Sequence, residues 1–426
     1  MLIHRVATLA GCVILAGSPL AIRDAHASDF VNDSKLSLLL RNAYMSRDFK
    51  NGVSDRAEWG QAAIGKYSSG FTPGLIGLGV DAHAMVAVRL DGGRGRSGAG
   101  GIDFFKQGDS GKAASDISKA GAAVKMRLSN TVITYGDQMP NYPVLSYSSS
   151  RLLPETYTGT SLVSKEISGL ELSLARFHAE SRKSEASRDS GLKSVNVVGG
   201  SYRFNEKLGT SLFFSDVEDQ LKKQYLNVNY VMPFDKISSL KLDFNGYKTK
   251  LDSAVVNRLH TEGDDNTIWS LAATYSHGPH SVILAHQRSS GDSLLGYPYG
   301  GYQNAGGRGD GGNTVWLANS YWSDFNAADE RSWQLGYGFN FASVGIPGLT
   351  YNLAYVRGTD ITTRQSTGGT EREIFNQIKY VVQSGPAKDL SFRARSSIRR
   401  VSEKSSDYSI GGNEVRVLVE YPLNIF

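Results

Sequence analysis

The residues best suited to chemistry lie in the stretch LSFRARSSIRRV, residues 390–401, which holds four arginines. Read at a period of two, Arg393 and Arg395 share one face, whereas Leu390 and Phe392 share the other. A guanidinium group binds carboxylates and phosphates through paired hydrogen bonds. A row of like charges on one face of a strand therefore indicates a surface that attracts anions.

Other segments repeat this arrangement of a cationic face opposite an apolar face. In KLSLLLRNAY the leucines at 36, 38 and 40 take one face, so Arg41 takes the other. In VKMRLSN, Met126 and Leu128 take one face, and in NEVRVLVEYPL the valines do. The cations that alternation places on the polar faces are Arg41, Lys125, Arg127, Lys241, Lys379, Arg393, Arg395 and Arg416.

The elements that must position these cations are β-strands. Segments of about ten alternating residues recur between clusters of Gly, Asn, Asp and Ser, and 47 glycines and 21 tyrosines suit strands and turns. No run of 18 apolar residues follows the N-terminal region, which excludes transmembrane helices. The net charge of +5 in 426 residues is too balanced for a nucleic-acid binder. We therefore expect an all-β chain.

Two all-β architectures fit such strands, a soluble sandwich or propeller and a transmembrane barrel. The chain shows neither the repeat nor the domain break expected of the first. Its tight connections, such as 231–239 and 276–281, alternate with long polar ones, including 91–115 and 289–313. Short turns alternating with long loops are typical of outer-membrane barrels. We favour the transmembrane barrel.

A barrel also explains the arginines. At a lipid-facing position near mid-membrane an arginine costs roughly 2–4 kcal/mol, so the apolar face must meet lipid and the cationic face the lumen. Arg399 and Arg400 are neighbours and cannot both face inward, so we expect the strand to leave the hydrocarbon there. The pattern predicts a water-filled pore that favours anions.

The N-terminal segment is typical of a secretory signal peptide. A basic start is followed by apolar residues and by Ala25-His26-Ala27, so we expect cleavage of residues 1–27 near Ala27. A lipoprotein site at Cys12, which is the only cysteine, is the alternative. At the other end EYPLNIF places an aromatic residue last, as expected of a barrel strand that the barrel-assembly machinery recognises.

Seven long stretches of the chain resemble the OprD-type family of outer-membrane carboxylate channels of Gram-negative bacteria. The resemblance implies a monomeric 18-stranded antiparallel barrel with an inward-folded constriction loop at 139–160, and a row of basic residues that passes small carboxylates. The stretches are DSKLSLLLRNAYMSRDF (33–49), SSGFTPGLIGLGVDA (68–82), SNTVITYGDQMPNYPVLSYSSSRLLPETYTG (129–159), SLKLDFNGYKTK (239–250), ERSWQLGYGF (330–339), KYVVQSGPAKDLSFRARS (379–396) and NEVRVLVEYPLNIF (413–426).

Matching the family's motifs adds Arg47 and Arg151 to the cations that line the pore, with Arg151 near the narrowest point. The pore-lining set is Arg41, Arg47, Arg127, Arg151, Lys241, Lys379, Arg393, Arg395 and Arg416. Arg331 lies in a matched motif but has the parity of Trp333. Ser148-Ser149-Ser150 stand where family members often carry acidic residues, which makes the expected constriction more purely basic.

These observations predict a passive channel for small organic acids, of the branch that takes aromatic and other small acids. The expected partners are the substrate, outer-membrane lipid and lipopolysaccharide, with no nucleic acid, metal or other cofactor. A general diffusion porin and the basic-amino-acid branch of the same family remain alternatives. An enzyme is less favoured because the chain has no G-x-S-x-G elbow, and an adhesive barrel because its polar faces carry excess arginine.

Overall fold

The computed structural model describes residues 30–92, 96–97, 102–108, 111–189, 192–293, 296 and 315–426. The expected signal peptide at 1–27 and its cleavage site lie outside the described residues. The strands of the first half are β1 (Lys35–Phe49), β2 (Arg56–Ser68), β3 (Ile76–Asp91), β4 (Asp116–Leu128), β5 (Thr131–Gln138), β6 (Asn141–Tyr142), β7 (Leu145–Ser146), β8 (Thr156–Ser164), β9 (Leu170–Ser181), β10 (Arg188–Asp189), β11 (Val195–Arg203) and β12 (Leu208–Val217).

The second half continues in the same way, with three short helices among the strands. Its elements are β13 (Leu221–Pro233), β14 (Ser238–Leu251), α1 (Ser253–Leu259), β15 (Asp265–His277), β16 (His280–Gly291), β17 (Arg331–Asn340), η1 (Phe341–Val344), β18 (Leu349–Ile361), β19 (Gly369–Val381), β20 (Ser391–Val401), η2 (Glu403–Ser405) and β21 (Gly412–Asn424).

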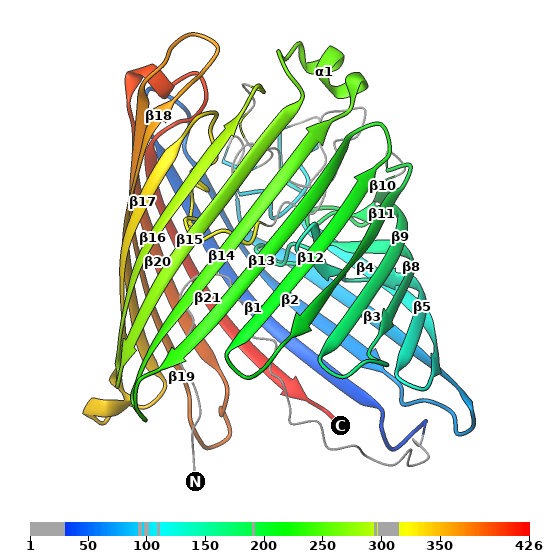
Figure 1. Cartoon of the computed structure of the whole chain (residues 1–426). Helices are drawn as coiled ribbons and strands as arrows, with labels where there is room; N and C mark the ends of the chain where they lie inside the picture. Colours follow the sequence, from blue (N-terminus) through cyan, green and yellow to red (C-terminus); the bar gives the residue numbers. More distant parts are fainter. Residues whose placement is uncertain are drawn as a thin grey trace.

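Eighteen of these strands form one closed antiparallel barrel (Figure 1). Each long strand pairs with its neighbours in the chain, and β1 pairs with β21 to close the ring, with Arg41 opposite Glu420. Closure leaves no free sheet edge, which is what a lipid environment requires. The prediction of an all-β, 18-stranded antiparallel barrel is confirmed.

The side chains alternate between the two faces of the barrel wall. On β21, Val415 and Val417 point outwards and are 42% and 41% exposed. Glu414 points inwards and is 4% exposed. A belt of exposed apolar residues on the outer face suits contact with lipid. The polar residues on the inner face therefore line an interior closed off from lipid.

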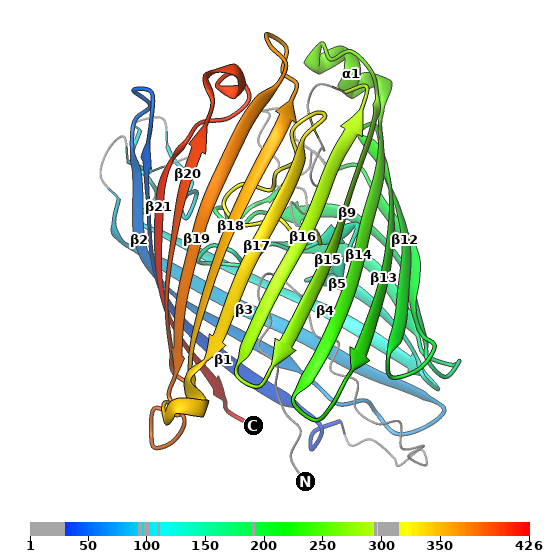
Figure 2. The ribbon, with the colours of Figure 1, turned by 60° about the vertical axis from the view of Figure 1, so that its left-hand side comes forward.

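The connections differ in length at the two ends of the barrel (Figure 2). Tight turns such as 129–130 and 278–279 join the strands at the end where the C-terminus lies, and longer connections such as 252–264, with α1, join them at the other. Longer loops face the cell exterior in outer-membrane barrels. No helix in the described ranges is long and apolar enough to cross a membrane.

Candidate functional site

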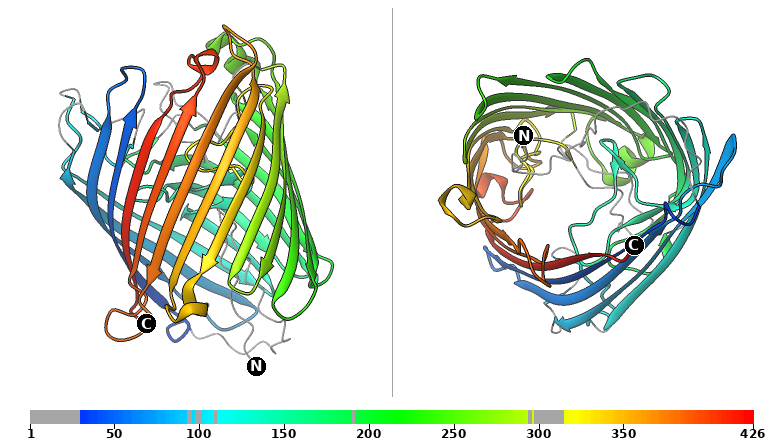
Figure 3. Two further views of the ribbon diagram at one scale, coloured as in Figure 1. Left: turned by 90° about the vertical axis from the view of Figure 1, so that its left-hand side faces the viewer. Right: turned by 90° about the horizontal axis from the view of Figure 1, so that it is seen from below.

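Three connections from the long-loop end fold back inside the ring of strands (Figure 3). They are the segment 102–108, the loop 139–155 between β5 and β8, and the segment 315–330 before β17. Contacts with the inner face of the wall hold each one in place. The shape of the pore therefore depends on these contacts as well as on the strands.

The loop 139–155 spans the interior and packs against opposite parts of the wall. At one end Leu152 and Leu153 are fully buried in an apolar cluster with residues of β1, β2 and β3. At the other end Val144 and Leu145 pack in a second cluster with side chains of β11 to β15. β8 begins at Thr156, so residues 156–160 of the expected loop belong to the wall instead.

Polar contacts fix this loop at several points. The Arg41 guanidinium donates to the carbonyl oxygens of Ser149 (3.2 Å), Arg151 (2.6 Å) and Leu152 (3.2 Å). The buried Lys119 ammonium of β4 donates to the Pro154 carbonyl at 3.0 Å. A carbonyl bound by a buried cation forms a charge-assisted hydrogen bond, which is stronger than a neutral one. Arg41 is thus an anchor of the loop.

Glu155 and Tyr247 add further loop contacts. Within the loop, the Glu155 carboxylate accepts from the Ser148 amide at 2.9 Å. On the far wall, the Tyr247 hydroxyl donates to the Pro143 carbonyl at 3.0 Å. These bonds fold the loop into a defined path across the barrel.

The segment 315–330 lies along the inner face of the strands that follow it. The Trp322 and Ser323 amides donate to the Glu373 carboxylate of β19 at 3.1 and 2.8 Å. The Trp322 ring lies 5.2 Å from the Arg47 guanidinium of β1, a cation–π contact. This segment therefore places an aromatic ring beside the basic residues of the interior.

The inner faces of β1, β20 and β21 carry arginines paired with a few glutamates. Glu420 accepts from Arg41 at 2.8 Å and from Arg393 at 3.1 Å. Glu414 accepts from Arg47 at 2.7 Å and from Arg416 at 3.0 Å. Each carboxylate thus holds two guanidinium groups in place and neutralises only one charge.

Arg395 differs from its neighbours in this row. Within the described residues it makes no ion pair or hydrogen bond, and its guanidinium lies 4.9 Å from the centre of the Phe375 ring. It stands directly opposite Arg416 in the β20–β21 register, and Tyr321 packs on Phe375 with ring centres 4.5 Å apart. Arg395 therefore has an aromatic support, while Glu414 and Glu373 act on it only through space, without a direct bond.

Arg151 lies in the loop 139–155 and faces the arginine row. Its side chain donates to the Ile102 carbonyl and to the Ser150 hydroxyl, the latter at 3.1 Å. Loss of hydration, followed by the charges of Arg416 and Arg47, lowers the pKa of Arg151 to about 10. The side chain therefore stays cationic at neutral pH.

Of the remaining predicted pore residues, Lys379 lies beside the arginine row, and Lys241 and Arg127 lie on other parts of the inner wall. Lys379 of β19 is half-buried opposite Arg393, and Lys241 of β14 pairs with Asp243 at 2.8 Å. Near the short-turn end of β4, Arg127 lies 4.5 Å from the Phe71 ring. Only part of the predicted set is thus gathered in one place, namely Arg41, Arg47, Arg151, Lys379, Arg393, Arg395 and Arg416.

Sequence reasoning missed the acidic half of this site. Glu414 and Glu420 have the same parity as Arg416, which was the available signal, but alternation alone does not reveal what each contacts. Arg399 was also missed: β20 continues to Val401, and Arg399 lies on the inner face, bonded to Glu371 of β19 at 2.7 Å. Arg400, its neighbour, takes the outer face, as expected for two consecutive residues of one strand.

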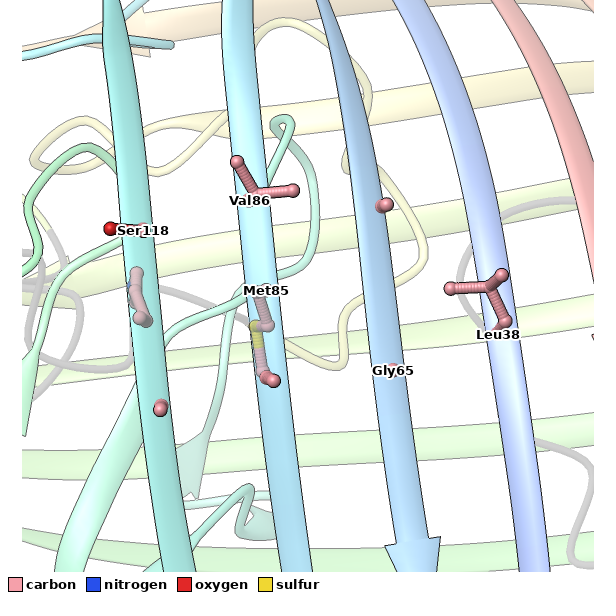
Figure 4. Close-up of a pocket in the computed structure, with 9 residues that line it drawn as sticks. Leu38, Gly65, Met85, Val86 and Ser118 are labelled. Atoms are coloured by element: carbon pink, nitrogen blue, oxygen red, sulfur yellow. The ribbon is translucent and has the colours of Figure 1, made fainter.

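Two features lie on the outer face and are separate from the arginine row. Arg331 is exposed there beside Trp333, in keeping with its parity. A shallow hollow over β1 to β4 is lined by residues that include Leu38, Gly65 and Val86 (Figure 4). The described residues also contain no cluster of three or more His, Cys, Asp or Glu side chains that could hold a metal ion.

A closed barrel with an apolar outer belt, inward-folded loops and a charged interior defines an outer-membrane channel. Residues 28–425 match the model of the OprD family of outer membrane porins, and the chain belongs to that family. It is 38% identical to Porin D of Pseudomonas aeruginosa, with 100% of each chain covered. Members of the family are channels in the outer membrane of Gram-negative bacteria that carry small organic substrates, so this chain is not an enzyme.

Solved structures agree with this assignment. OccAB1 of Acinetobacter baumannii superposes with a TM-score of 0.86 at 35% identity, covering 94% of this chain and 99% of that one. OpdK of Pseudomonas aeruginosa, solved with vanillate, superposes with a TM-score of 0.80 at 31% identity, covering 93% and 100%. The fold of the whole barrel is therefore shared with these channels.

Proposed function

We propose that this channel takes up small carboxylates by passive diffusion along the basic residues of its inner wall. The observation that carries the proposal is Arg395, a pore-side arginine directly opposite Arg416 that makes no ion pair or hydrogen bond to any described residue. A carboxylate that reached this pair would supply the missing counter-charge through bidentate hydrogen bonds. Among the arginines on the inner faces of β1, β20 and β21, Arg395 is thus the one that would gain its first direct ion pair from a bound anion.

The charge balance around Arg395 supports the same conclusion. The inner faces of the four consecutive strands β19, β20, β21 and β1 carry more cations than anions, so the net local potential is positive. The cations are Lys379, Arg393, Arg395, Arg399, Arg416, Arg41 and Arg47, and the anions are Glu371, Glu373, Glu414 and Glu420.

The paired arginines have a second role in this proposal. Arg41, Arg47, Arg393 and Arg416 are oriented by Glu414 and Glu420, so they present fixed donors instead of mobile side chains. Contacts between a moving substrate and these arginines must stay weak, because a tightly bound substrate would block the channel. Substrate would pass from Arg151 and Arg47 towards Arg395 and Lys379, and then to the more distant Lys241 and Arg127.

We also propose that the loop 139–155 forms the constriction. It crosses the interior between two apolar clusters, and its Arg151 carries the charge nearest the arginine row. Ser148, Ser149 and Ser150 give this loop hydroxyl groups in place of acidic ones. A loop without free carboxylates favours an anion over a basic amino acid.

Among carboxylates, aromatic and other small organic acids suit the site best. Phe375 and Tyr321 form an aromatic pair beside Arg395, and such surroundings suit a substrate that carries a ring next to its carboxylate. The similar channel OpdK was solved with vanillate, an aromatic acid. The alternatives are the basic-amino-acid branch of the family and a general diffusion porin.

Uptake into liposomes tests this proposal. Protein reconstituted into vesicles should take up radiolabelled benzoate in a saturable manner, with competition from unlabelled small acids and none from arginine or lysine. Arg395→Gln should slow uptake several-fold, whereas Lys222→Gln, at an exposed outer-face position, should not change it. Competition by arginine or lysine would favour the other branch, and uptake that never saturates would favour a general porin.

A further inference from the structure

The outer face of the barrel carries a second set of arginines, at the long-loop end of five consecutive strands. All five have the outward parity of their strands, and four of them are exposed. We call this set the arginine band: Arg288 of β16, Arg331 of β17, Arg357 of β18, Arg372 of β19 and Arg400 of β20.

The strand register places these arginines directly beside one another. Arg288 lies opposite Arg331, and Arg372 lies between Arg357 and Arg400 as the cross-strand partner of both. Directly opposed residues have Cβ atoms roughly 4.5–5.5 Å apart, and like charges in such pairs are destabilising. Three like-charged pairs therefore lie on one surface of the barrel.

The described part of the chain offers these arginines little counter-charge. Arg288, Arg357 and Arg372 have no ion pair or hydrogen bond to any described residue. Arg331 has one long ion pair, 3.9 Å from Asp360, and Arg400 bonds to the Gly412 carbonyl and the Asn413 side chain. The band is thus a cationic surface that the wall itself does not neutralise.

The neighbouring part of the same rim is built differently. On β12 to β15 the exposed outer-face lysines each have a nearby aspartate, and Lys222 is 3.6 Å from Asp216. Lys248 is 3.4 Å from Asp265, and Lys250 is 3.3 Å from Asp264. Charge on the outer rim is therefore balanced on one side of the barrel and left unbalanced on β16 to β20.

The level of the band identifies the environment that it meets. One outward position closer to the membrane on β16, β17 and β18 stand His286, Trp333 and Tyr355. His286 packs on Trp333 with ring centres 4.4 Å apart, and Trp333 is 56% exposed. Tryptophan and tyrosine mark the membrane–water interface. The band thus lies just outside the hydrocarbon, at the depth of the outer-leaflet headgroups.

We propose that the arginine band binds the phosphate groups of lipid A in the outer leaflet. A phosphate accepts bidentate hydrogen bonds from guanidinium groups, and its charge turns each opposed arginine pair from a repulsive contact into a bridged one. The aromatic residues below would contact the sugar and the upper acyl chains. The substrate path is on the opposite face of the wall, so this site is independent of uptake.

A binding experiment on the folded barrel tests the proposal. Protein purified in detergent, stripped of lipid and incubated with bisphosphorylated lipid A is analysed by native mass spectrometry. The wild type should retain lipid A, and the double variant Arg357→Gln/Arg372→Gln should bind it at least tenfold more weakly. The matched control is Lys222→Gln/Lys250→Gln, which removes a directly opposed lysine pair at the same rim and should bind as the wild type does.

Further measurements test whether the protein binds the phosphorylated lipid rather than free phosphate, and whether the double variant is folded. Lipid A with both phosphates removed should not bind, and inorganic phosphate at the same concentration should not displace the intact lipid. Single-channel conductance of the double variant should equal that of the wild type, which confirms that the barrel is folded. Three results would each overturn the proposal. They are unchanged lipid A binding by a conducting double variant, retention of the dephosphorylated lipid, and displacement of lipid A by inorganic phosphate.

Discussion

Replacement of Arg41 by leucine should release the loop 139–155 from one wall of the pore. Arg41 is 8% exposed, and it joins three loop carbonyls to Glu420. Removing one partner of a buried charged network costs roughly 3–5 kcal/mol. Because 1.4 kcal/mol is a tenfold change in an equilibrium constant, about 3 kcal/mol should raise the population of displaced loop on the order of 10²-fold.

The loop should still stay inside the barrel in this variant. Lys119, Tyr247 and the apolar packing of Leu152 continue to hold it. We therefore expect brief states of higher conductance and a noisier open current, rather than one larger stable pore. Single-channel recording in a planar bilayer measures both.

A matched control separates loop release from the loss of charge. Arg393→Leu removes a cation bonded to the same carboxylate, Glu420, and Arg393 makes no hydrogen bond or ion pair to the loop among the described residues. It should leave the open-channel noise at the wild-type level. Equal noise in the wild type and Arg41→Leu would refute the reasoning, as would equal increases in both variants.

Two further predictions concern the charge balance and the wall. Glu414→Gln should make the channel more anion-selective, because Arg47 and Arg416 lose their shared counter-charge. The reversal potential in a salt gradient measures the ion selectivity, and a shift towards cation selectivity would contradict the prediction. Gly159→Ala should lower the yield of folded barrel, because the new Cβ would lie 2.1 Å from the Arg176 carbonyl oxygen across the β8–β9 pair. Gly65→Ala is the control and should fold normally, because its Cβ would lie 3.4 Å from the nearest atom. Gel mobility with and without heating measures the folded fraction of each variant, and equal yields would contradict the prediction.

Alternation was enough to predict the barrel and the face of most wall residues. Leu36, Leu38 and Leu40 require one face for lipid, so the other face of β1 follows from the pleat alone. The same argument places Arg331 outside, beside Trp333. These conclusions depend only on local geometry, which the sequence records directly.

The partners of the arginines could not be predicted in this way. Arg41 and Glu420 are 379 positions apart and meet only because β21 closes the ring against β1. Which carbonyls Arg41 binds depends on the path of an irregular loop, which no periodicity describes. The sequence therefore indicated a row of cations, whereas the structure contains a network of ion pairs. On the inner face of β20, Arg393 and Arg399 each bond to a glutamate, and Arg395 bonds to none in the described chain.

Single-channel current during titration with small carboxylates tests the central claim most directly. For the wild type we predict a small conductance and concentration-dependent block by one or a few acids. Arg395→Gln should raise the blocking concentration by roughly tenfold, the loss expected for one charge-assisted contact of about 1.5 kcal/mol. A large, steady conductance that no acid blocks, or block that is unchanged in Arg395→Gln, would contradict the account.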